Sequence, residues 1–222
     1  MEIERKFGRL QEFDNRSRAF PIRTLLEEKP LRSYGWRCTL RLDQGQSSSC
    51  VGHAWAHELA GLPVEEKNVA EDVAMRIYHT AQTLDDYPGE NYDGTSVLGG
   101  VKAVQQLFPH AIDEYRWAFG LQDVLQALAY IGPVVLGINW YSGMCYPDAH
   151  GYIAVTGSLQ GGHAILANEV NMMRRIVRLH NSWGAGWGNQ GNCFVSFDEL
   201  DRLLKEGGEA CVPLKRKLVP IK

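Results

Sequence analysis

The chain has 222 residues, 45% of them hydrophobic, and a formal net charge of −3. This length and composition suit one catalytic domain with a sizeable buried core. The weak charge gives no bulk attraction to nucleic acid or to a membrane surface, and no run of about 18 apolar residues marks a membrane span. We therefore expect neither a nucleic-acid partner nor a membrane one.

The first 35 residues are predicted to form an N-terminal arm, followed by a catalytic domain at 36–222. Residues 1–41 contain ten Lys or Arg against six Asp or Glu, a surplus of four positive charges. A basic docking arm is one interpretation, but the charges alternate and no aromatic residues are interleaved to stack on bases. An ordinary solvated segment that packs along the domain is favoured.

The N-terminal residues, Met1 to Lys6, lack the apolar core of a signal peptide. A cytoplasmic protein is the expectation, and delivery by a non-classical route, such as inside a phage particle, is the alternative. We also expect a monomer.

The first half of the chain is predicted to be mainly helical. Apolar residues recur at helical spacing after a potential cap at Ser48-Ser49, namely Val51, Ala54, Trp55 and Leu59, and Gly61-Leu62-Pro63 ends the run. Further helices are predicted at 69–84, with Asn68 as its cap, at 96–107 and at about 121–130. Cys50 then opens a helix, where unsatisfied N–H groups lower the thiol pKa and can hold an oxyanion.

The second half reads as mainly β. Strands are predicted at 133–140, 163–170, 176–181 and 193–197, with one helix near 199–205. The predicted class is therefore α+β.

Three short stretches, 44–50, 161–164 and 180–184, contain the residue types that thiol-dependent acyl transfer requires. A thiol is mostly protonated at neutral pH, so a nucleophilic Cys50 needs an adjacent base, and His163 can be that base. The carboxamide oxygen of Asn181 can accept the other ring proton of His163 and fix its orientation. Gln44 offers a side-chain NH2 to the oxyanion, and the backbone N–H of Cys50 offers a second donor.

At these residues the chain resembles the papain-like cysteine peptidases. Their pattern places a Gln six positions before the catalytic Cys, then a His-Ala pair, then Asn-Ser-Trp-Gly-x-Gly-Trp-Gly. Gln44 precedes Cys50 by six positions, His163 precedes Ala164, and residues 181–188 match the third block at every specified position. Over roughly residues 36–200, the resemblance implies Cys50 as nucleophile, His163 as base, Asn181 as the residue that orients this base, and Gln44 as oxyanion donor.

The resemblance also implies a two-lobed fold with the active site in the cleft between the lobes. The helical left lobe would span about 44–130 and the β-barrel-like right lobe about 131–222. Trp183 would shield the hydrogen bond between His163 and Asn181 from water.

The chain departs from the family pattern at three positions. Ser47 stands where a disulfide-forming Cys is usual, Val51 replaces a Trp, and Gly162 precedes the base where some members carry Asp or Asn. Only 49 residues precede Cys50, so we expect a form without a long inhibitory propeptide. Residues 20–22 of the arm could cover the cleft, but packing against a lobe is favoured.

The other cysteines and a nearby histidine have ordinary interpretations. Apart from Cys50, the chain has Cys38, Cys145, Cys193 and Cys211, which allow three disulfide pairings, but reduced thiols are favoured without a secretion signal. Cys50 and His53 could form a metal pair, yet a hydrogen-bonded His53 in the lobe interior is favoured because zinc needs further ligands. We expect no metal and no cofactor.

Substrate-binding residues follow only from the resemblance. The backbone of Gly94 would pair with an extended peptide, Ala164 would line the pocket for the residue before the cleaved one, and Trp183 would border the same site. Without the resemblance, Gly94 is equally a turn glycine before a helix cap at Thr95 or Ser96, and Ala164 a small strand residue.

The leading prediction is a cysteine endopeptidase that forms a thioester acyl-enzyme on Cys50, which water resolves. The same triad could pass the acyl group to an amine, giving a transpeptidase or isopeptidase, because acceptor choice depends on cleft shape and water access. A non-catalytic peptide-binding module is a third possibility, although degenerate members usually lose a triad residue and this chain has all three. Each prediction has a protein or peptide partner.

Overall fold

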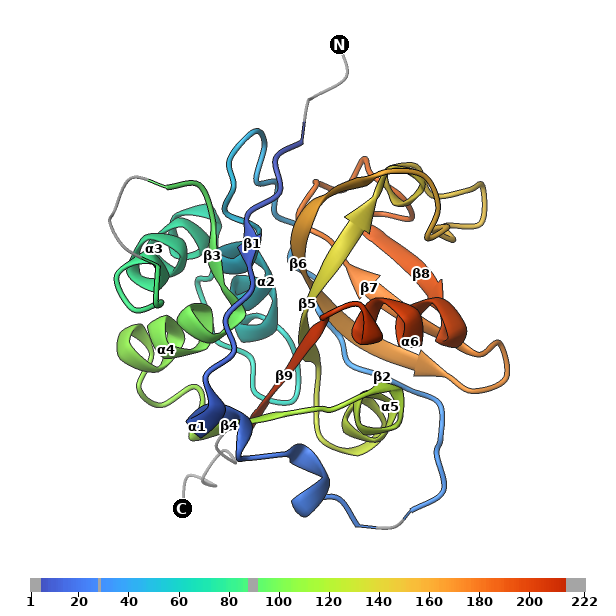
Figure 1. Ribbon diagram of the computed structural model, residues 1–222, viewed down its shortest axis with the longest axis horizontal. Helices are drawn as coiled ribbons and strands as arrows, with labels where there is room; N and C mark the ends of the chain where they lie inside the picture. Colours follow the sequence, from blue (N-terminus) through green and yellow to red (C-terminus); the bar gives the residue numbers. More distant parts are fainter. Residues whose placement is uncertain (1–4, 28, 88–91, 215–222) are drawn as a thin grey trace.

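Helices occupy most of the first half of the chain and strands most of the second half in the computed structural model, which describes residues 5–27, 29–87 and 92–214 (Figure 1). The α-helices are α1 (Asn15–Arg18), α2 (Cys50–Leu59), α3 (Glu71–Gln82), α4 (Val97–Leu107), α5 (Leu121–Tyr130) and α6 (Phe197–Lys205). The strands are β1 (Arg9–Leu10), β2 (Tyr34–Gly35), β3 (Thr95–Ser96), β4 (Glu114–Trp117), β5 (Val134–Tyr141), β6 (Leu159–Asn171), β7 (Ile176–His180), β8 (Asn192–Ser196) and β9 (Glu209–Leu214). Among the described residues, no helix is long and apolar enough to cross a bilayer.

The helix α2 lies at the centre of the first of two hydrophobic cores. All its residues are buried, and it packs against α3, α4 and β6. Two glycines permit this packing, because a Cβ at Gly52 would lie 2.2 Å from the Ala74 carbonyl oxygen and one at Gly100 would lie 2.4 Å from Trp55. Larger residues would push the helices apart. Close packing therefore fixes α2 and, with it, Cys50 at its first residue.

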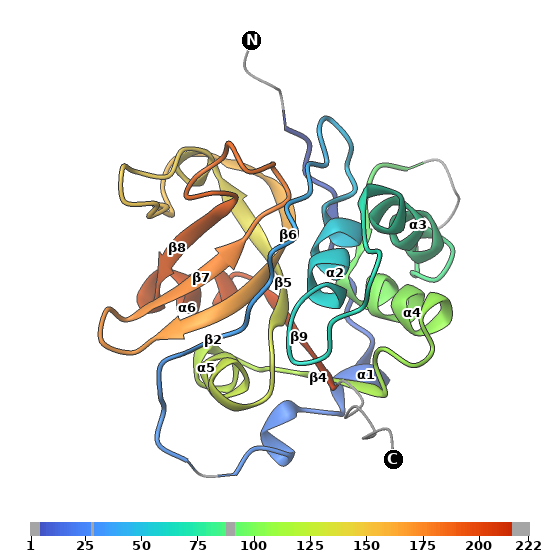
Figure 2. The same ribbon diagram turned by 180° about the vertical axis from the view of Figure 1, so that it is seen from behind.

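The second core is formed by an antiparallel sheet and the helices that cover it. The strand order is β4-β9-β5-β6-β7-β8, and β2 pairs with β6 off this path. The ends of this order, β4 and β8, do not pair with each other among the described residues, so the lobe is a sheet and not a closed barrel. Seen from opposite sides, α2 lies between α3 and α4 on one side and β5 and β6 on the other (Figures 1 and 2).

The helix α5 belongs to the second core, contrary to the predicted lobe boundary at 130. Its residues Val124 and Leu128 pack in the same cluster as Ile165 of the sheet and Leu203 of α6. Helical periodicity identifies α5 correctly but carries no information about which core its apolar face joins. The helical core therefore consists of α2, α3 and α4.

The predicted elements agree with the structure where patterning is regular. Helices α2, α4 and α5 and strands β5 to β8 lie at or within a few residues of their predicted places. The strands β4 and β9 were not predicted, and neither were β1 and β3, which are two residues long. A pair of two-residue strands joined over a long sequence distance leaves no periodic signal.

Of the predicted helix caps, the one at Asn68 is wrong, the one at Ser48-Ser49 is right in position, and the one at Thr95 or Ser96 is right. Asn68 has a φ of +62° and lies before α3, whose N-cap residue is Ala70. Ser49 occupies the N-cap position of α2 but its side chain does not cap the helix, and its Oγ instead contacts Ser47 and His53. Ser96 does cap α4, because its Oγ accepts a hydrogen bond from Gly99 N at 2.7 Å.

A buried histidine at the end of β7 should make the fold sensitive to acid. Burial lowers the pKa of His180 from its ordinary 6.5 to about 4. Between these values the unfolded chain binds a proton that the folded chain excludes, so this contribution to stability is complete above pH 6.5 and declines as the pH falls toward 4. We expect His180 to reduce the free energy of unfolding by about 2 kcal/mol between pH 7 and pH 5.

Urea denaturation at both pH values checks this expectation. The variant His180→Gln should lose less stability between pH 7 and pH 5 than the parent chain, whatever its absolute stability. Equal losses in the two proteins would show that His180 is not responsible.

Candidate active site

The first turn of α2 brings Cys50 against strand β6. Its side chain is buried, and Ala164 N on β6 lies 3.4 Å from Cys50 Sγ in donor geometry. Burial raises the pKa of the Cys50 thiol, whereas the backbone N–H groups of Ala164, Gly8 and Val51 oppose that rise. N–H groups around a sulfur stabilise a thiolate once water reaches the site.

The imidazole of His163 is held by Asn181. His163 Nε2 lies 2.8 Å from Asn181 Oδ1, which also accepts a hydrogen bond from Ser182 N at 2.9 Å. Since Oδ1 can only accept, Nε2 carries the proton and Nδ1 is left with its lone pair. Nδ1 is buried and has no hydrogen-bond partner among the described residues, and burial lowers the pKa of His163 from 6.5 to about 4. This imidazole is neutral and has one nitrogen ready to accept a proton.

Two tryptophans enclose the His163 to Asn181 pair. The rings of Trp140 and Trp183 lie 4.8 Å and 5.3 Å from the His163 ring, centre to centre, and both side chains are buried. They exclude water from the hydrogen bond, which strengthens it. Trp183 therefore lies where it was predicted, whereas Trp140 was not predicted because nothing in its local sequence on β5 distinguishes it from a core residue.

Gln44 presents its NH2 group at the same site. Its Oε1 accepts a hydrogen bond from Ser182 Oγ at 2.7 Å, which fixes the orientation of the amide and directs Nε2 toward the covered site. Nε2 donates to Ser47 O at 2.8 Å and to Lys6 O at 3.2 Å. A backbone bond from Gln44 N to Ser182 O ties the two loops together. Ser182 is thus a positioning residue that the motif contains but that sequence reasoning did not single out.

The N-terminal residues of the chain cover Cys50. Residues 5–10, here called the covering segment, run across α2 on the side shown in Figure 1, and β1 pairs in parallel with β3. Gly8 fits closely, since a Cβ there would lie 1.8 Å from the Ser48 carbonyl oxygen. The Phe7 ring lies 5.9 Å from that of His163, and Arg5 forms an ion pair with Asp43. The prediction that residues 20–22 pack against a lobe agrees with a buried Ile22, and a different part of the arm lies over the cysteine.

The covering segment does not lie as a peptide ready for cleavage. In acyl transfer the nucleophile and the oxyanion donor must act on one carbonyl group. Here Gln44 Nε2 contacts the Lys6 carbonyl oxygen, whereas the group nearest the Cys50 sulfur is the N–H of Gly8. These atoms belong to two different peptide groups, so the segment blocks the site without presenting a carbonyl carbon to the sulfur.

Gly94 and Ala164 were both predicted to bind substrate. The contacts that they make in the structure differ from the predicted ones. Thr95 N, and not Gly94, donates to Gly8 O, at 2.8 Å. The Gly94 N–H is taken by Tyr78 OH, and its φ of +105° together with a Cβ position 2.4 Å from Gly8 O requires glycine. Ala164 is buried and pairs with Gly137 across β5 and β6.

A second Cys, His and Asn lie together near the helical core. Cys38 Sγ is 3.9 Å from His180 Nε2, and His180 Nδ1 is 2.9 Å from Asn192 Oδ1. The surroundings differ, because Cys38 Sγ donates to the His57 carbonyl oxygen at 3.3 Å. A carbonyl oxygen beside the sulfur favours the protonated thiol and opposes a thiolate.

His53 and the cysteines fit their ordinary interpretations. His53 is buried in the helical core, with Nδ1 2.9 Å from Ser49 O and Nε2 2.8 Å from Glu71 Oε2. All five cysteines are free. Within the described ranges, no group of three or more His, Cys, Asp or Glu side chains is arranged to hold a metal ion.

Comparison with solved structures identifies the architecture. Xylellain, a cysteine protease from Xylella fastidiosa, superposes with a TM-score of 0.74 over 98% of this chain and 100% of its own, at 18% identity. The chain has the papain-like fold. A digestive procathepsin L 3 of Tenebrio molitor also superposes, with a TM-score of 0.65 over 93% of this chain and 75% of its own, at 16% identity. Bromelain from Ananas comosus, solved with an inhibitor, gives 0.58 over 85% and 100% at 16% identity.

The papain-like fold therefore confirms the predicted fold class. No protein-family model and no curated relative matches the sequence. At these identities, the structural likeness establishes the fold, and the chemistry must be argued from the residues of the site.

Proposed function

We propose that the chain is a cysteine endopeptidase in which Cys50, His163, Asn181 and Gln44 act together. The observation that carries this proposal is that the Cys50 thiol lies 3.4 Å from the backbone N of Ala164, the residue next to His163. The His163 imidazole is oriented by Asn181, and the Gln44 amide is fixed by Ser182, the residue next to Asn181. The papain-like fold supports this chemistry by analogy.

The reaction follows from these positions. His163 Nδ1 takes the proton of the Cys50 thiol, and the thiolate attacks the substrate carbonyl carbon. Gln44 Nε2 and the Cys50 N–H, which as the first residue of α2 has no partner within the helix, stabilise the oxyanion. The imidazolium then gives its proton to the leaving amine, which leaves a thioester on Cys50. Water attacks the thioester with His163 again accepting a proton, and the free thiol and a carboxylic acid result.

The Cys50 group is a better nucleophilic site than the Cys38 group. Thiolate formation is favoured by the donors around Cys50 and opposed by the carbonyl oxygen beside Cys38. His180 Nε2 also lies 2.8 Å from Leu40 O. In the tautomer that donates a hydrogen bond to this oxygen, the proton is on Nε2, which is the ring nitrogen nearest Cys38. Such a nitrogen cannot act as the base.

Two alternatives share the same scaffold. A transpeptidase or isopeptidase would use the same residues with an amine acceptor, and mass analysis of products formed with and without added amine distinguishes it from a hydrolase. A peptide-binding module would show peptide affinity that Cys50→Ala leaves unchanged and no turnover of any substrate.

Labelling with an epoxide-type cysteine probe tests the proposal. We expect a single adduct on Cys50, located by peptide mass spectrometry in reducing buffer, and a labelling rate at least about tenfold lower in His163→Ala, because the base that generates the thiolate is gone. The variant His57→Gln, which alters a buried histidine outside the site, serves as control. Labelling of the parent chain that spreads over several cysteines without preference for Cys50 would contradict the proposal.

A further inference from the structure

An arginine of the covering segment enters a site with a buried carboxylate, one residue from the contact with Cys50. Arg9 Nε and Nη2 lie 2.9 Å and 2.5 Å from Glu209 Oε2, and Arg9 Nη2 also donates to Gly207 O at 2.9 Å. The two charged side chains are only 3% and 0% exposed. Such a pair costs considerable desolvation and persists only when its geometry is well supported.

The walls of this Arg9 site are made by residues without bulky side chains. Ala164, Gly137 and Glu209 lie side by side across β6, β5 and β9, since Gly137 pairs with both of the others. A Cβ on Gly137 would lie 2.7 Å from Arg9 Nε, and one on Gly162 would lie 2.2 Å from Arg9 O. Neither glycine has a positive φ, so close approach of the chain, and not backbone conformation, accounts for them: Gly137 leaves space for the Arg9 side chain and Gly162 for the Arg9 backbone.

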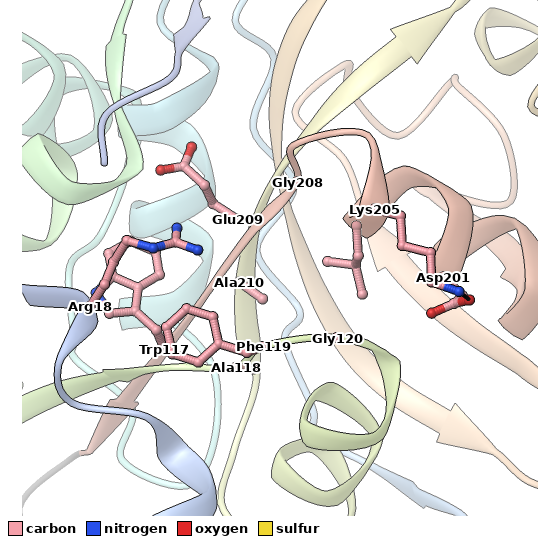
Figure 3. Close-up of a pocket in the computed structure, with 11 residues that line it drawn as sticks. Arg18, Trp117, Ala118, Phe119, Gly120, Asp201, Lys205, Gly208, Glu209 and Ala210 are labelled. Atoms are coloured by element: carbon pink, nitrogen blue, oxygen red, sulfur yellow. Dashed lines mark hydrogen bonds and ion pairs between the residues drawn. The ribbon is translucent and has the colours of Figure 1, made fainter. Parts of the chain in front are cut away.

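Arg9 is the cation that compensates Glu209. Glu209 also borders a cavity of about 190 Å³, in which its carboxylate points away from Asp201 and Lys205 of α6 (Figure 3). Lys205 pairs with Asp201 instead. Even with Arg9 bound, Glu209 Oε1 has no hydrogen-bond partner among the described residues. When Arg9 leaves, this deeply buried carboxylate loses both of its side-chain donors and keeps only the backbone hydrogen bond from Glu12 and the more distant charge of Arg18.

A peptide substrate must displace the covering segment, because that segment blocks Cys50. The displacing peptide then meets the same glycine-lined site and the same carboxylate. A guanidinium satisfies Glu209 Oε2 through two N–H groups and Gly207 O through one, a pattern that the single ammonium of lysine does not reproduce. A neutral side chain leaves the carboxylate buried and unpaired.

We infer that Glu209 is a specificity-determining residue and that the enzyme takes peptides with an arginine in the place of Arg9, close to the cleaved bond. This inference rests on the proposed peptidase function for its substrate. The binding site itself does not depend on catalysis, and the two can be tested separately.

The binding test uses the full-length variant Arg9→Ala, in which the site is vacated. N-acetyl-arginine amide is the probe, and N-acetyl-citrulline amide, which has a similar shape but no charge, is its control. We expect thermal denaturation to show stabilisation by the arginine compound with an affinity about ten- to a hundredfold higher than that of the citrulline compound. Adding Glu209→Gln should remove this difference. The variant Arg16→Ala, which breaks an exposed ion pair with Asp14, should show none.

The substrate test uses the parent chain and the single variant Glu209→Gln, so it does not require that Arg9→Ala folds. A peptide library with arginine fixed at each position in turn should show one position, within about two residues of the cleaved bond, at which arginine raises hydrolysis and at which Glu209→Gln abolishes the preference. Equal binding of both amides together with equal hydrolysis of arginine and leucine peptides would overturn the inference and leave Arg9 to Glu209 as a structural ion pair. Arginine-selective binding without any hydrolysis would retain the site and reject the peptidase.

Discussion

Replacing Cys50 with serine should lower kcat/KM for peptide hydrolysis by at least about a thousandfold, because a hydroxyl is far less acidic than a thiol and His163 is oriented only by the neutral carboxamide of Asn181. The side chain is nearly isosteric and fully buried, so the fold should be retained. Hydrolysis of a peptide library, together with a thermal denaturation curve for each protein, measures both effects.

The matched control is Cys38→Ser. Cys38 has its own His and Asn neighbours, His180 and Asn192, and is similarly buried. We expect this variant to retain activity within about a factor of two, since the Cys38 sulfur donates to the His57 carbonyl oxygen, which favours the protonated thiol. If Cys38→Ser were inactive while folded and Cys50→Ser active, the nucleophile would have been misassigned.

The positions of the proposed catalytic side chains could be predicted because each side chain belongs to a short motif whose spacing reflects local structure. Gln44 and Cys50 flank one tight loop before α2, and 181–184 follow directly on β7, so their relative positions depend on few intervening residues. Apolar periodicity then placed α2 and β6 correctly. What the sequence could not give is the pairing of β6 with α2 across more than a hundred residues, which the resemblance supplied.

The residues that surround the catalytic group were not predictable for a different reason. Trp140, Ser182 and Glu209 lie on regular strands or in a motif loop, where an aromatic, a hydroxyl and a carboxylate have many ordinary uses. The role of Glu209 depends on its register opposite Gly137, and β9 itself was missed. Register between strands is a property of the packed sheet and has no local sequence signal here.

The covering segment shows the same limit at the N-terminus. Its charged residues read as a solvated arm, yet Arg9 is buried and Phe7 contacts the aromatic enclosure of His163. Two-residue pairing of β1 with β3, and space left by Gly8, Gly137 and Gly162, hold the segment in place. These are contacts between distant parts of the chain. The charged composition of the segment alone predicted that it is exposed to solvent.

Displacing the covering segment should therefore activate the protein, and Gly8→Ala is the smallest change that does so. A Cβ at this position would lie 1.8 Å from the Ser48 backbone oxygen, which cannot move without disturbing the start of α2. If the covered state dominates in the parent chain, only the uncovered fraction binds substrate, and raising that fraction raises the apparent kcat/KM in proportion. We expect an increase of about tenfold or more in peptide hydrolysis and in the rate at which iodoacetamide alkylates Cys50.

The pH dependence of alkylation separates uncovering from a general loosening of the fold. In the covered state burial raises the thiol pKa of Cys50 and lowers that of His163, so the pair is neutral and reacts slowly near neutral pH. Solvent access removes both shifts, and the alkylation profile of Gly8→Ala should move to lower pH than that of the parent chain. Gly132→Ala is the matched control, because a Cβ there makes one ordinary 3.6 Å contact, with Pro63, and does not touch the covering segment. Unchanged or lower activity in a folded Gly8→Ala, with an unshifted alkylation profile, would mean that the segment does not restrain the active site.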